Sequence, residues 1–183
     1  MKLDIHTHIL PSNLPNLKER YGCGGWINIK KCENDPNVAN MYKDDEFFRR
    51  VEKNCWCLKD RCDDMCKTNV DIQVLSTVPV MFNYAAKPEH TNDLSRLLND
   101  DIASQIRENH KENNGKRFYG FGTLPMQDST YAVEEMTRCI KDLGFKGIQI
   151  GTHINDWNLD EKKLFPIWKR AEELDCAIFV HPW

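Results

Sequence analysis

Short runs of β-branched and aromatic residues alternate along the chain with longer segments in which apolar residues recur every three or four positions. Five short runs predict β-strands, at residues 2–6, 71–76, 118–123, 147–151 and 176–181. The longer segments predict amphipathic helices, at residues 59–67, 90–109, 130–143 and 160–174. This order predicts an α/β fold, in which a parallel sheet is connected by helical crossovers.

Individual residues indicate where these helices begin and end. Thr91 or Asn92 is expected to cap the second helix, and Asp160 is expected to begin the fourth. Gly144 follows the third helix in the position where a left-handed C-cap is favoured.

The spacing of the first two strands is irregular. The later strands start about 30 residues apart, as βαβ units do, whereas about 65 residues separate the first strand from the second. Helix 59–67 can supply the usual crossover, which leaves residues 10–57 as an excursion. Because a connection of that length is usually functional or disordered, we expect this excursion to form a lid or wall over an active site.

Composition makes a nucleic-acid partner improbable and suggests an incomplete core. The 183 residues suffice for one domain, but 40% hydrophobic residues and a mean hydropathy of -0.63 are slightly polar for a compact globule. A net charge of -3 and a pI of about 6.1 leave no excess positive charge to neutralise phosphates.

The chain shows no signal for membrane insertion or secretion. Its longest apolar runs, such as residues 177–180, are far shorter than the ~20 residues that span a bilayer. Asp4 and His6 stand where a signal peptide would need apolar residues. We therefore expect a cytosolic protein without a membrane partner.

Eight cysteines need an interpretation that suits a reducing compartment, where a disulfide framework is improbable. Cys55, Cys57, Cys62 and Cys66 could in principle form a four-cysteine zinc cage. Neither pair has the commonest two-residue gap, so ordinary free thiols are favoured, and the cage stays as an alternative.

The strongest chemical signal is Asp-Ile-His-Thr-His at the end of the first strand. Residues two apart in a strand share a face, so His6 and His8 can bind one metal ion, and Asp4 could orient one of their rings. His181 ends the fifth strand. Barrel enzymes place catalytic groups at strand carboxyl ends, so these three histidines predict a Zn2+ site with an open position for water.

The other histidines are weaker candidates. His153 follows strand 147–151 and is interpreted as a pocket wall or structural residue, while His90 and His110 are expected to be solvated. Lys146 precedes that strand, so no lysine stands at its carboxyl end to bridge two metals, which argues for a single ion.

Arg49 and Arg50 lie within the excursion and allow two interpretations. A basic pair on a polar stretch is by default a solvated face. Within a lid over a metal site, a guanidinium is instead suited to bidentate recognition of a substrate carboxylate. The residues alone leave both interpretations open.

Several motifs together carry a family resemblance. The chain resembles the metal-dependent decarboxylases of the amidohydrolase superfamily in segments along its whole length, at residues 4–11, 21–26, 54–56, 75–82, 122–127, 147–153 and 179–183. The resemblance implies a (β/α)8 TIM barrel, truncated here after about five strands, with the excursion between the first two strands.

The resemblance also implies site residues and an activity. His6, His8 and His181 match the family's zinc-binding histidines, and Arg49 matches its substrate-carboxylate arginine. The implied reaction is a zinc-dependent, non-oxidative decarboxylation of a semialdehyde carboxylate formed in tryptophan breakdown, with no organic cofactor. The implied partners are this small-molecule carboxylate and, for the full-length enzyme, a second copy in a homodimer.

The family's acid/base histidine and fourth metal ligand have no counterpart in this chain. We therefore expect residues 1–183 to be an N-terminal part of a metal-dependent barrel domain, with residues 10–57 as its lid. Such a fragment would expose strand edges and apolar faces, and would be inactive and aggregation-prone. The alternatives are a hydrolase of the same superfamily, a cysteine-rich zinc-binding interaction module and a degenerate, regulatory half-barrel.

Overall fold

Five parallel strands form the main sheet of the computed structural model, which describes residues 1–113 and 117–182. The strands are β1 (Leu3–Ile9), β5 (Ile72–Thr77), β6 (Phe118–Gly122), β7 (Gly147–Gly151) and β10 (Ala177–His181), and they lie in that order. All five predicted strands are present, with boundaries shifted by at most three residues. Strands that follow one another in the chain are also adjacent in this sheet, so each new strand is added at the same edge.

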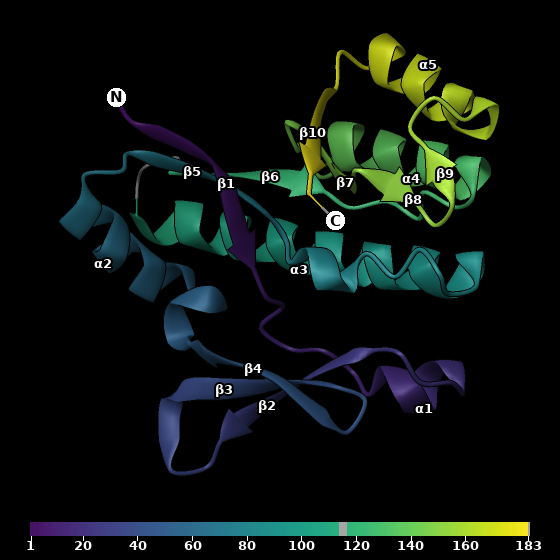
Figure 1. The fold of residues 1–183 in the computed structure, drawn as a ribbon. Coiled ribbons are helices and arrows are strands. Elements are labelled where there is room, and N and C mark those ends of the chain that lie inside the picture. Colours follow the sequence, from purple (N-terminus) through teal and green to yellow (C-terminus); the bar gives the residue numbers. More distant parts are fainter. Residues whose placement is uncertain (114–116, 183) are drawn as a thin grey trace.

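A helix separates each pair of successive strands of this sheet. The four helices are α2 (Leu58–Thr68), α3 (Pro88–Asn113), α4 (Ser129–Lys141) and α5 (Phe165–Glu173). Figure 1 shows the strands as a curved sheet with α3 and α4 running alongside it. Sequential parallel strands with helical crossovers are the repeating unit of a (β/α)8 barrel, so the predicted fold class, a TIM barrel present in part, is confirmed.

The predicted start of the second helix is wrong. Helix α3 begins at Pro88, where the carbonyl oxygen of Lys87 accepts from the amides of His90 and Thr91 at 3.0 and 3.1 Å. Pro88 suits a first turn because that turn needs no amide donor. Thr91 therefore lies inside the helix, and its hydroxyl donates to the carbonyl of Asn83 at 2.9 Å.

The last helix also begins later than expected. A short 3-10 helix, η3 (Lys162–Leu164), precedes α5, so Asp160 does not begin the α-helix. Pro166 in the first turn of α5 accounts for the later start. The expected left-handed turn after α4 is present, since Gly144 has a φ of 73°.

The excursion, residues 10–57, is an ordered unit rather than a disordered loop. It contains a short helix, α1 (Leu17–Tyr21), and an antiparallel sheet of β2 (Ile27–Cys32), β3 (Asp35–Lys43) and β4 (Glu46–Glu52), followed by the 3-10 helix η1 (Lys53–Cys55). This sheet lies apart from the parallel strands, at the bottom of the view in Figure 1.

The excursion packs against the barrel through its own hydrophobic core. That core joins Trp26, Ala39 and Met41 of the excursion to Met81 of the 3-10 helix η2 (Pro79–Met81) and to Leu98 of α3. Because η2 follows β5, the excursion covers the side of the barrel on which the strands end.

Polar contacts reinforce this docking at the start of α3. The ring of Tyr21 stacks on His90 at 4.8 Å, and its hydroxyl donates to Asp93 at 2.7 Å. Arg20 forms an ion pair with the same carboxylate at 2.6 Å. His90 is therefore partly buried beneath the excursion, and the expectation that it is solvated is wrong.

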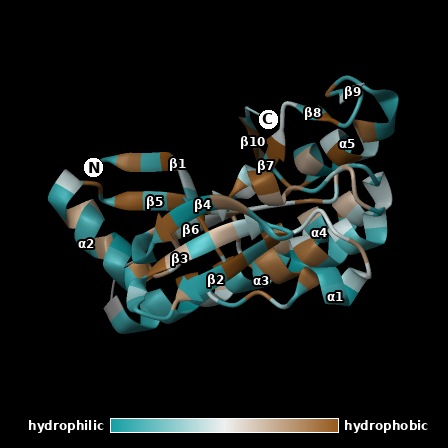
Figure 2. Ribbon diagram, turned by 60° about the horizontal axis from the view of Figure 1, so that its bottom comes forward, coloured by the Kyte–Doolittle hydropathy of each residue, from teal (hydrophilic) through white to brown (hydrophobic). Residues whose placement is uncertain are grey.

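The two outer strands of the parallel sheet expose apolar side chains, as expected for a partial barrel. Leu3 and Ile5 of β1 are 52% and 45% exposed, and Val180 of β10 is 43% exposed. In Figure 2 the ribbon of the inner strand β5 has mainly hydrophobic colouring, and that of α2 is mainly hydrophilic. The exposed apolar positions thus gather where a complete barrel would continue.

A fully buried carboxylate joins α3, α4 and the end of β6. Glu135 accepts from Arg138 at 2.7 Å and from the amide of Asn99 at 2.7 Å, and Arg96 lies 3.1 Å away. Asn99 in turn holds both the amide and the carbonyl of Thr123, each at 2.9 Å. The network satisfies a buried charge and fixes the backbone directly after β6.

Removing this carboxylate should destabilise the fold. Replacing Glu135 with Ala leaves Arg138 and the Asn99 amide without their partner, so we expect the free energy of unfolding to fall by about 3 kcal/mol. Chemical denaturation of both proteins measures the difference. The exposed neighbour Glu134, replaced in the same way, is the matched control, and an equal loss in both variants would contradict the proposed role of the network.

Candidate metal centre

Three histidines from the two outer strands of the parallel sheet meet at its carboxyl edge. His6 and His8 lie on β1 and His181 ends β10. Their candidate ligand nitrogens all lie within 4.8 Å of one another. Within residues 1–113 and 117–182, no other cluster of histidine, cysteine or acidic residues could hold a metal ion.

The surroundings of His8 determine which of its ring nitrogens carries the proton. Its Nδ1 lies 3.0 Å from the carbonyl oxygen of Thr77 and 3.1 Å from the hydroxyl oxygen of Ser76. A carbonyl can only accept, so Nδ1 must carry the hydrogen. The hydroxyl of Ser76 donates to the carbonyl of Thr7, which leaves its oxygen free to accept as well. Nε2 of His8 therefore presents a lone pair.

His181 is held in the same tautomer. Its Nδ1 lies beside the carbonyl oxygen of Pro182, so the neutral ring carries its hydrogen on Nδ1 and presents Nε2 as an acceptor. The Nε2 atoms of His8 and His181 face each other at 3.2 Å. Two lone pairs at that distance repel unless a cation lies between them. Two ligands of a tetrahedral zinc ion with Zn–N bonds of ~2.1 Å would be about 3.4 Å apart, which matches the observed pair closely.

The electrostatic environment keeps His8 ready to bind a metal. Burial, and then the neighbouring rings of His181 and His6, lower the pKa of His8 to about 4. The ring is therefore neutral at pH 7, as a metal ligand must be. His6 is exposed and meets His181 edge to face, with ring centroids 4.8 Å apart, so it is the third member of the cluster.

Asp4 does not orient a histidine ring, contrary to the sequence-based interpretation. Its carboxylate accepts from the backbone amide of His6 at 3.2 Å. The pairing of β1 with β5 is irregular between Asp4 and Thr7, which interrupts the two-residue alternation on which the interpretation depended. The carboxylate therefore supports the backbone of the strand.

The groups that orient His8 were not found by sequence reasoning. The carbonyl of Thr77 accepts from His8 and also from Nε2 of the fully buried Gln149, at 3.1 Å. A backbone carbonyl leaves no mark in a sequence. Gln149 could have been noticed as a polar residue in the otherwise apolar strand β7.

The four-cysteine cage is not present. Cys55, Cys57, Cys62 and Cys66 form no ligand cluster, and all eight cysteines of the chain are free thiols. Burial raises the pKa of Cys176 to about 11 and holds that of Cys139 well above its ordinary value. These two thiols are therefore protonated and inert at neutral pH.

His153 and His110 have structural surroundings. His153, on the short strand β8 (His153–Ile154) that pairs with β9 (Trp157–Asn158), lines a cavity of about 600 Å³, as its interpretation as a pocket wall anticipated. Trp26 and Lys43 of the excursion line the same cavity. His110 is partly buried, and its Nε2 lies 3.1 Å from the carbonyl of Phe118, so it is not simply solvated.

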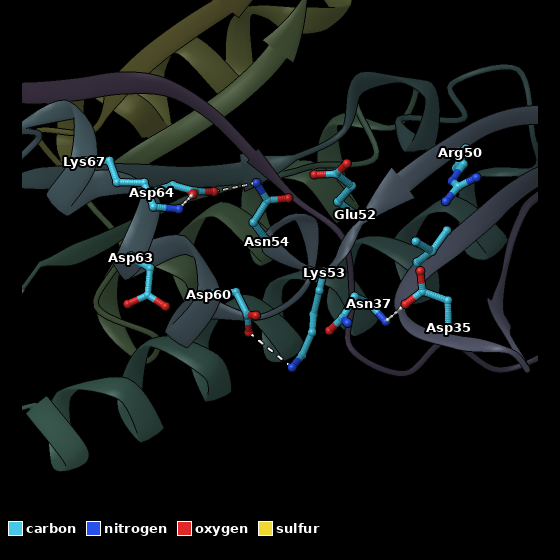
Figure 3. Close-up of a pocket in the computed structure, with 11 residues that line it drawn as sticks. Asp35, Asn37, Arg50, Glu52, Lys53, Asn54, Asp60, Asp63, Asp64 and Lys67 are labelled. Carbon is cyan, nitrogen blue, oxygen red and sulfur yellow. Dashed lines mark hydrogen bonds and ion pairs between the residues drawn. The ribbon is translucent and has the colours of Figure 1, made fainter.

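Arg49 and Arg50 lie on opposite faces of β4. Arg49 pairs in register with Met41, whose side chain is buried in the core between excursion and barrel, so Arg49 shares the face turned toward the barrel. Arg50 lines a polar groove on the other face, together with Asp35 and Glu52 (Figure 3). The described contacts do not join Arg49 to the three histidines; its side chain is exposed beside Phe48.

The described part of the chain contains no helix that is both long and apolar enough to cross a membrane.

Comparisons with known proteins identify the family of the chain. An amidohydrolase family model matches residues 3–183. The chain is 49% identical to 2-amino-3-carboxymuconate-6-semialdehyde decarboxylase of Dictyostelium discoideum, an alignment that covers 100% of the chain and 49% of the relative. It is 32% identical to the protein of the same name in Caenorhabditis elegans, with 100% of the chain and 56% of the relative covered. The chain thus spans about half the length of the relatives it matches.

A solved structure shows a related fold with a metal bound. A 5-carboxyvanillate decarboxylase from Novosphingobium aromaticivorans, crystallised with manganese and a nitrobenzoic acid, superposes with a TM-score of 0.64. It is 30% identical, and the match covers 71% of this chain and 36% of that chain.

Removing any one of the three histidines should abolish tight metal binding. We expect His8→Ala to weaken Co2+ binding by more than ~100-fold. Loss of a residue that only hydrogen-bonds to a metal ligand costs up to about 100-fold, and loss of the ligand itself should cost more. The visible absorption of bound Co2+ measures this affinity. His153→Ala is the matched control and should bind like the parent, whereas unchanged binding by His8→Ala would contradict the site.

Replacing the cysteines tests the alternative of a cysteine-rich zinc-binding module. A chain with Cys55, Cys57, Cys62 and Cys66 all changed to Ser should keep its Co2+ affinity, because these thiols form no cluster. Titration with the same ion checks this result. Loss of binding in this variant, with binding retained by His8→Ala, would favour the cysteine-rich module.

Proposed function

Since the chain belongs to the amidohydrolase family, we propose that it carries the metal-binding part of the active site of a metal-dependent decarboxylase. The observation that carries the proposal is the pair of Nε2 atoms of His8 and His181, which face each other at the edge where the strands end. The relatives are named as decarboxylases, and the proposed class of reaction is taken from these names.

The proposed substrate is 2-amino-3-carboxymuconate 6-semialdehyde, which loses carbon dioxide to give 2-aminomuconate semialdehyde. In tryptophan breakdown this reaction limits the formation of quinolinate. The names of two relatives that align with the whole chain support this choice. The activity belongs to the whole protein, since the relatives are about twice as long as this chain.

Zinc is the proposed metal, held by His6, His8 and His181. Neutral imidazoles suit Zn2+. The Nε2 atoms of His8 and His181 are about as far apart as two ligands of a tetrahedral zinc ion. Such an ion would supply Lewis acidity and an acidified water for attack on the substrate. The manganese in the related 5-carboxyvanillate decarboxylase makes Mn2+ the competing ion.

Arg49 is proposed to hold a substrate carboxylate. Loss of carbon dioxide leaves an electron pair, which the conjugated semialdehyde can take up once it is hydrated or protonated. A guanidinium binds a carboxylate through two parallel hydrogen bonds and so fixes its orientation. The position of Arg49 on the face of β4 that is turned toward the barrel supports this role, and Arg50 on the opposite face does not share it.

The excursion, residues 10–57, is proposed to act as a lid or wall of the active site. Its residues Trp26 and Lys43 form one side of the cavity that His153 lines beyond β7. His153 follows Gly151 by two residues, and Gly151 at the end of β7 pairs with His181, which supports a place for this cavity on the side of the metal centre.

A cytosolic location and a homodimeric whole protein complete the proposal. The eight free cysteines support a reducing compartment. The homodimer follows from the family resemblance, and sedimentation of the whole protein tests it.

In the whole protein, replacing Arg49 should damage substrate binding. We expect Arg49→Met to lower kcat/KM for the semialdehyde by about 10- to 100-fold, because a charge-assisted hydrogen bond contributes roughly 1.5–3 kcal/mol. Release of carbon dioxide at several substrate concentrations measures both constants. The control Arg50→Met should stay within about twofold of the parent.

Three results would overturn the proposal. Equal activity of Arg49→Met and the parent would remove the assigned role of that residue. Full activity after removal of metal by a chelator would remove the metal-dependent mechanism. Hydrolysis of an amide or lactone, without release of carbon dioxide from the semialdehyde, would identify a hydrolase of the same superfamily.

A further inference from the structure

Arg61 of α2 donates to two backbone carbonyls from separate segments of the chain. Its Nη2 donates to the carbonyl of His8 at 2.7 Å, and its Nε donates to the carbonyl of Asn54 at 3.0 Å. No ion pair within the described part of the chain uses this guanidinium. Its two hydrogen bonds therefore hold the backbone just before the excursion, at His8, and near its end, at Asn54.

We propose that Arg61 is a positioning residue that couples the excursion to the metal centre by holding His8 and Asn54 together. This inference rests on the proposed metal site and adds a residue and a coupling to it. Arg61 itself touches neither metal nor substrate in this assignment. It acts through the backbone of His8.

The place of these bonds makes the coupling direct. The excursion leaves the barrel at residue 10 and returns near residue 57. The amide of Leu10 donates to the carbonyl of Cys55 at 2.7 Å, so the two ends are already hydrogen-bonded to each other. Arg61 bridges the same two ends one step closer to the metal, between His8 and Asn54. A displacement of the excursion would therefore pull on the backbone of a metal ligand.

Helix α2 holds the returning end of the excursion at a second point. The side-chain amide of Asn54 donates to Asp64 at 2.7 Å, as the dashed line in Figure 3 shows. Arg61 and Asp64 are three residues apart, so they lie on one face of α2. Asn54 is thus bound through both its carbonyl and its side chain, while the carbonyl of His8 is bound to this helix through Arg61.

The geometry requires arginine rather than lysine. The two acceptors belong to different segments and are met by different nitrogens of one planar guanidinium. The fixed fork of that group holds both carbonyls at a set separation. A lysine has a single terminal nitrogen, so it cannot present two separate donor atoms at a fixed separation.

Arg117 provides a matched control. Its guanidinium also donates to two backbone carbonyls, those of Val70 at 2.7 Å and Asp71 at 3.2 Å. These acceptors precede β5, so they lie at the opposite end of the strands from the histidines. Arg61→Met and Arg117→Met remove the same kind of contact, and only the first touches a metal-binding residue.

The experiment titrates the parent chain and both variants with Co2+ and follows the visible absorption of the bound ion. We expect Arg61→Met to weaken binding by about 10- to 100-fold, the range for outer-shell partners of metal ligands. Arg117→Met should stay within about twofold of the parent. Thermal unfolding followed by circular dichroism gives the loss of stability in each variant, which should be similar.

Limited proteolysis measures the coupling itself. Bound Co2+ should slow cleavage within residues 10–57 of the parent and of Arg117→Met, and should have no such effect on Arg61→Met. A purely structural role of Arg61 would raise cleavage equally with and without the ion. Arg61→Lys should fall between the parent and Arg61→Met in affinity, and it replaces the Met variant in every comparison if that variant does not fold.

The outcomes separate this inference from the proposed function. If the parent itself does not bind Co2+ through its histidines, the metal site is wrong. If the parent binds but Arg61→Met binds equally well, only the positioning role is overturned. A similar loss of affinity in Arg61→Met and Arg117→Met would also overturn it, because the loss would then follow stability and not position.

Discussion

The site depends on two backbone carbonyls that accept from histidine Nδ1 atoms. Thr77 and Pro182 supply these carbonyls, to His8 and His181 respectively. Each bond fixes the tautomer of its ring and turns Nε2 toward the other histidine. A carbonyl at the end of a parallel strand has no further ladder partner, so it is free to orient a side chain. Both carbonyls lie at the carboxyl ends of strands, Thr77 on β5 and Pro182 directly after β10, so the curved edge of the sheet positions the candidate ligand set.

Much of this arrangement could be predicted from the sequence, because strand periodicity and strand ends are local properties. The runs around Ile148 and Phe179 identify strands, and the histidines stand at or near the ends of theirs. The parallel pairing of β7 with β10 then follows from the repeating βαβ unit. The confirmed fold class rests on this regularity.

What could not be predicted depends on contacts between distant segments. The irregular pairing of β1 turned Asp4 from its expected role, and no local pattern reveals such a bulge. Helices α3 and α5 have Pro88 and Pro166 in their first turns, and they do not start at the residues expected to cap them. Arg61 resembles any surface arginine of an amphipathic helix until the carbonyls of His8 and Asn54 are placed beside it.

The hydrogen bond between Leu10 and Cys55 has a consequence for how this family can diversify. It closes the excursion at its base, so the segment behaves as a module whose ends are joined whatever lies between them. Residues can be added or lost in the turn between β2 and β3 without moving the strand that carries His8. If the excursion is the proposed lid, substrate preference can therefore change in the module while the proposed metal centre stays constant.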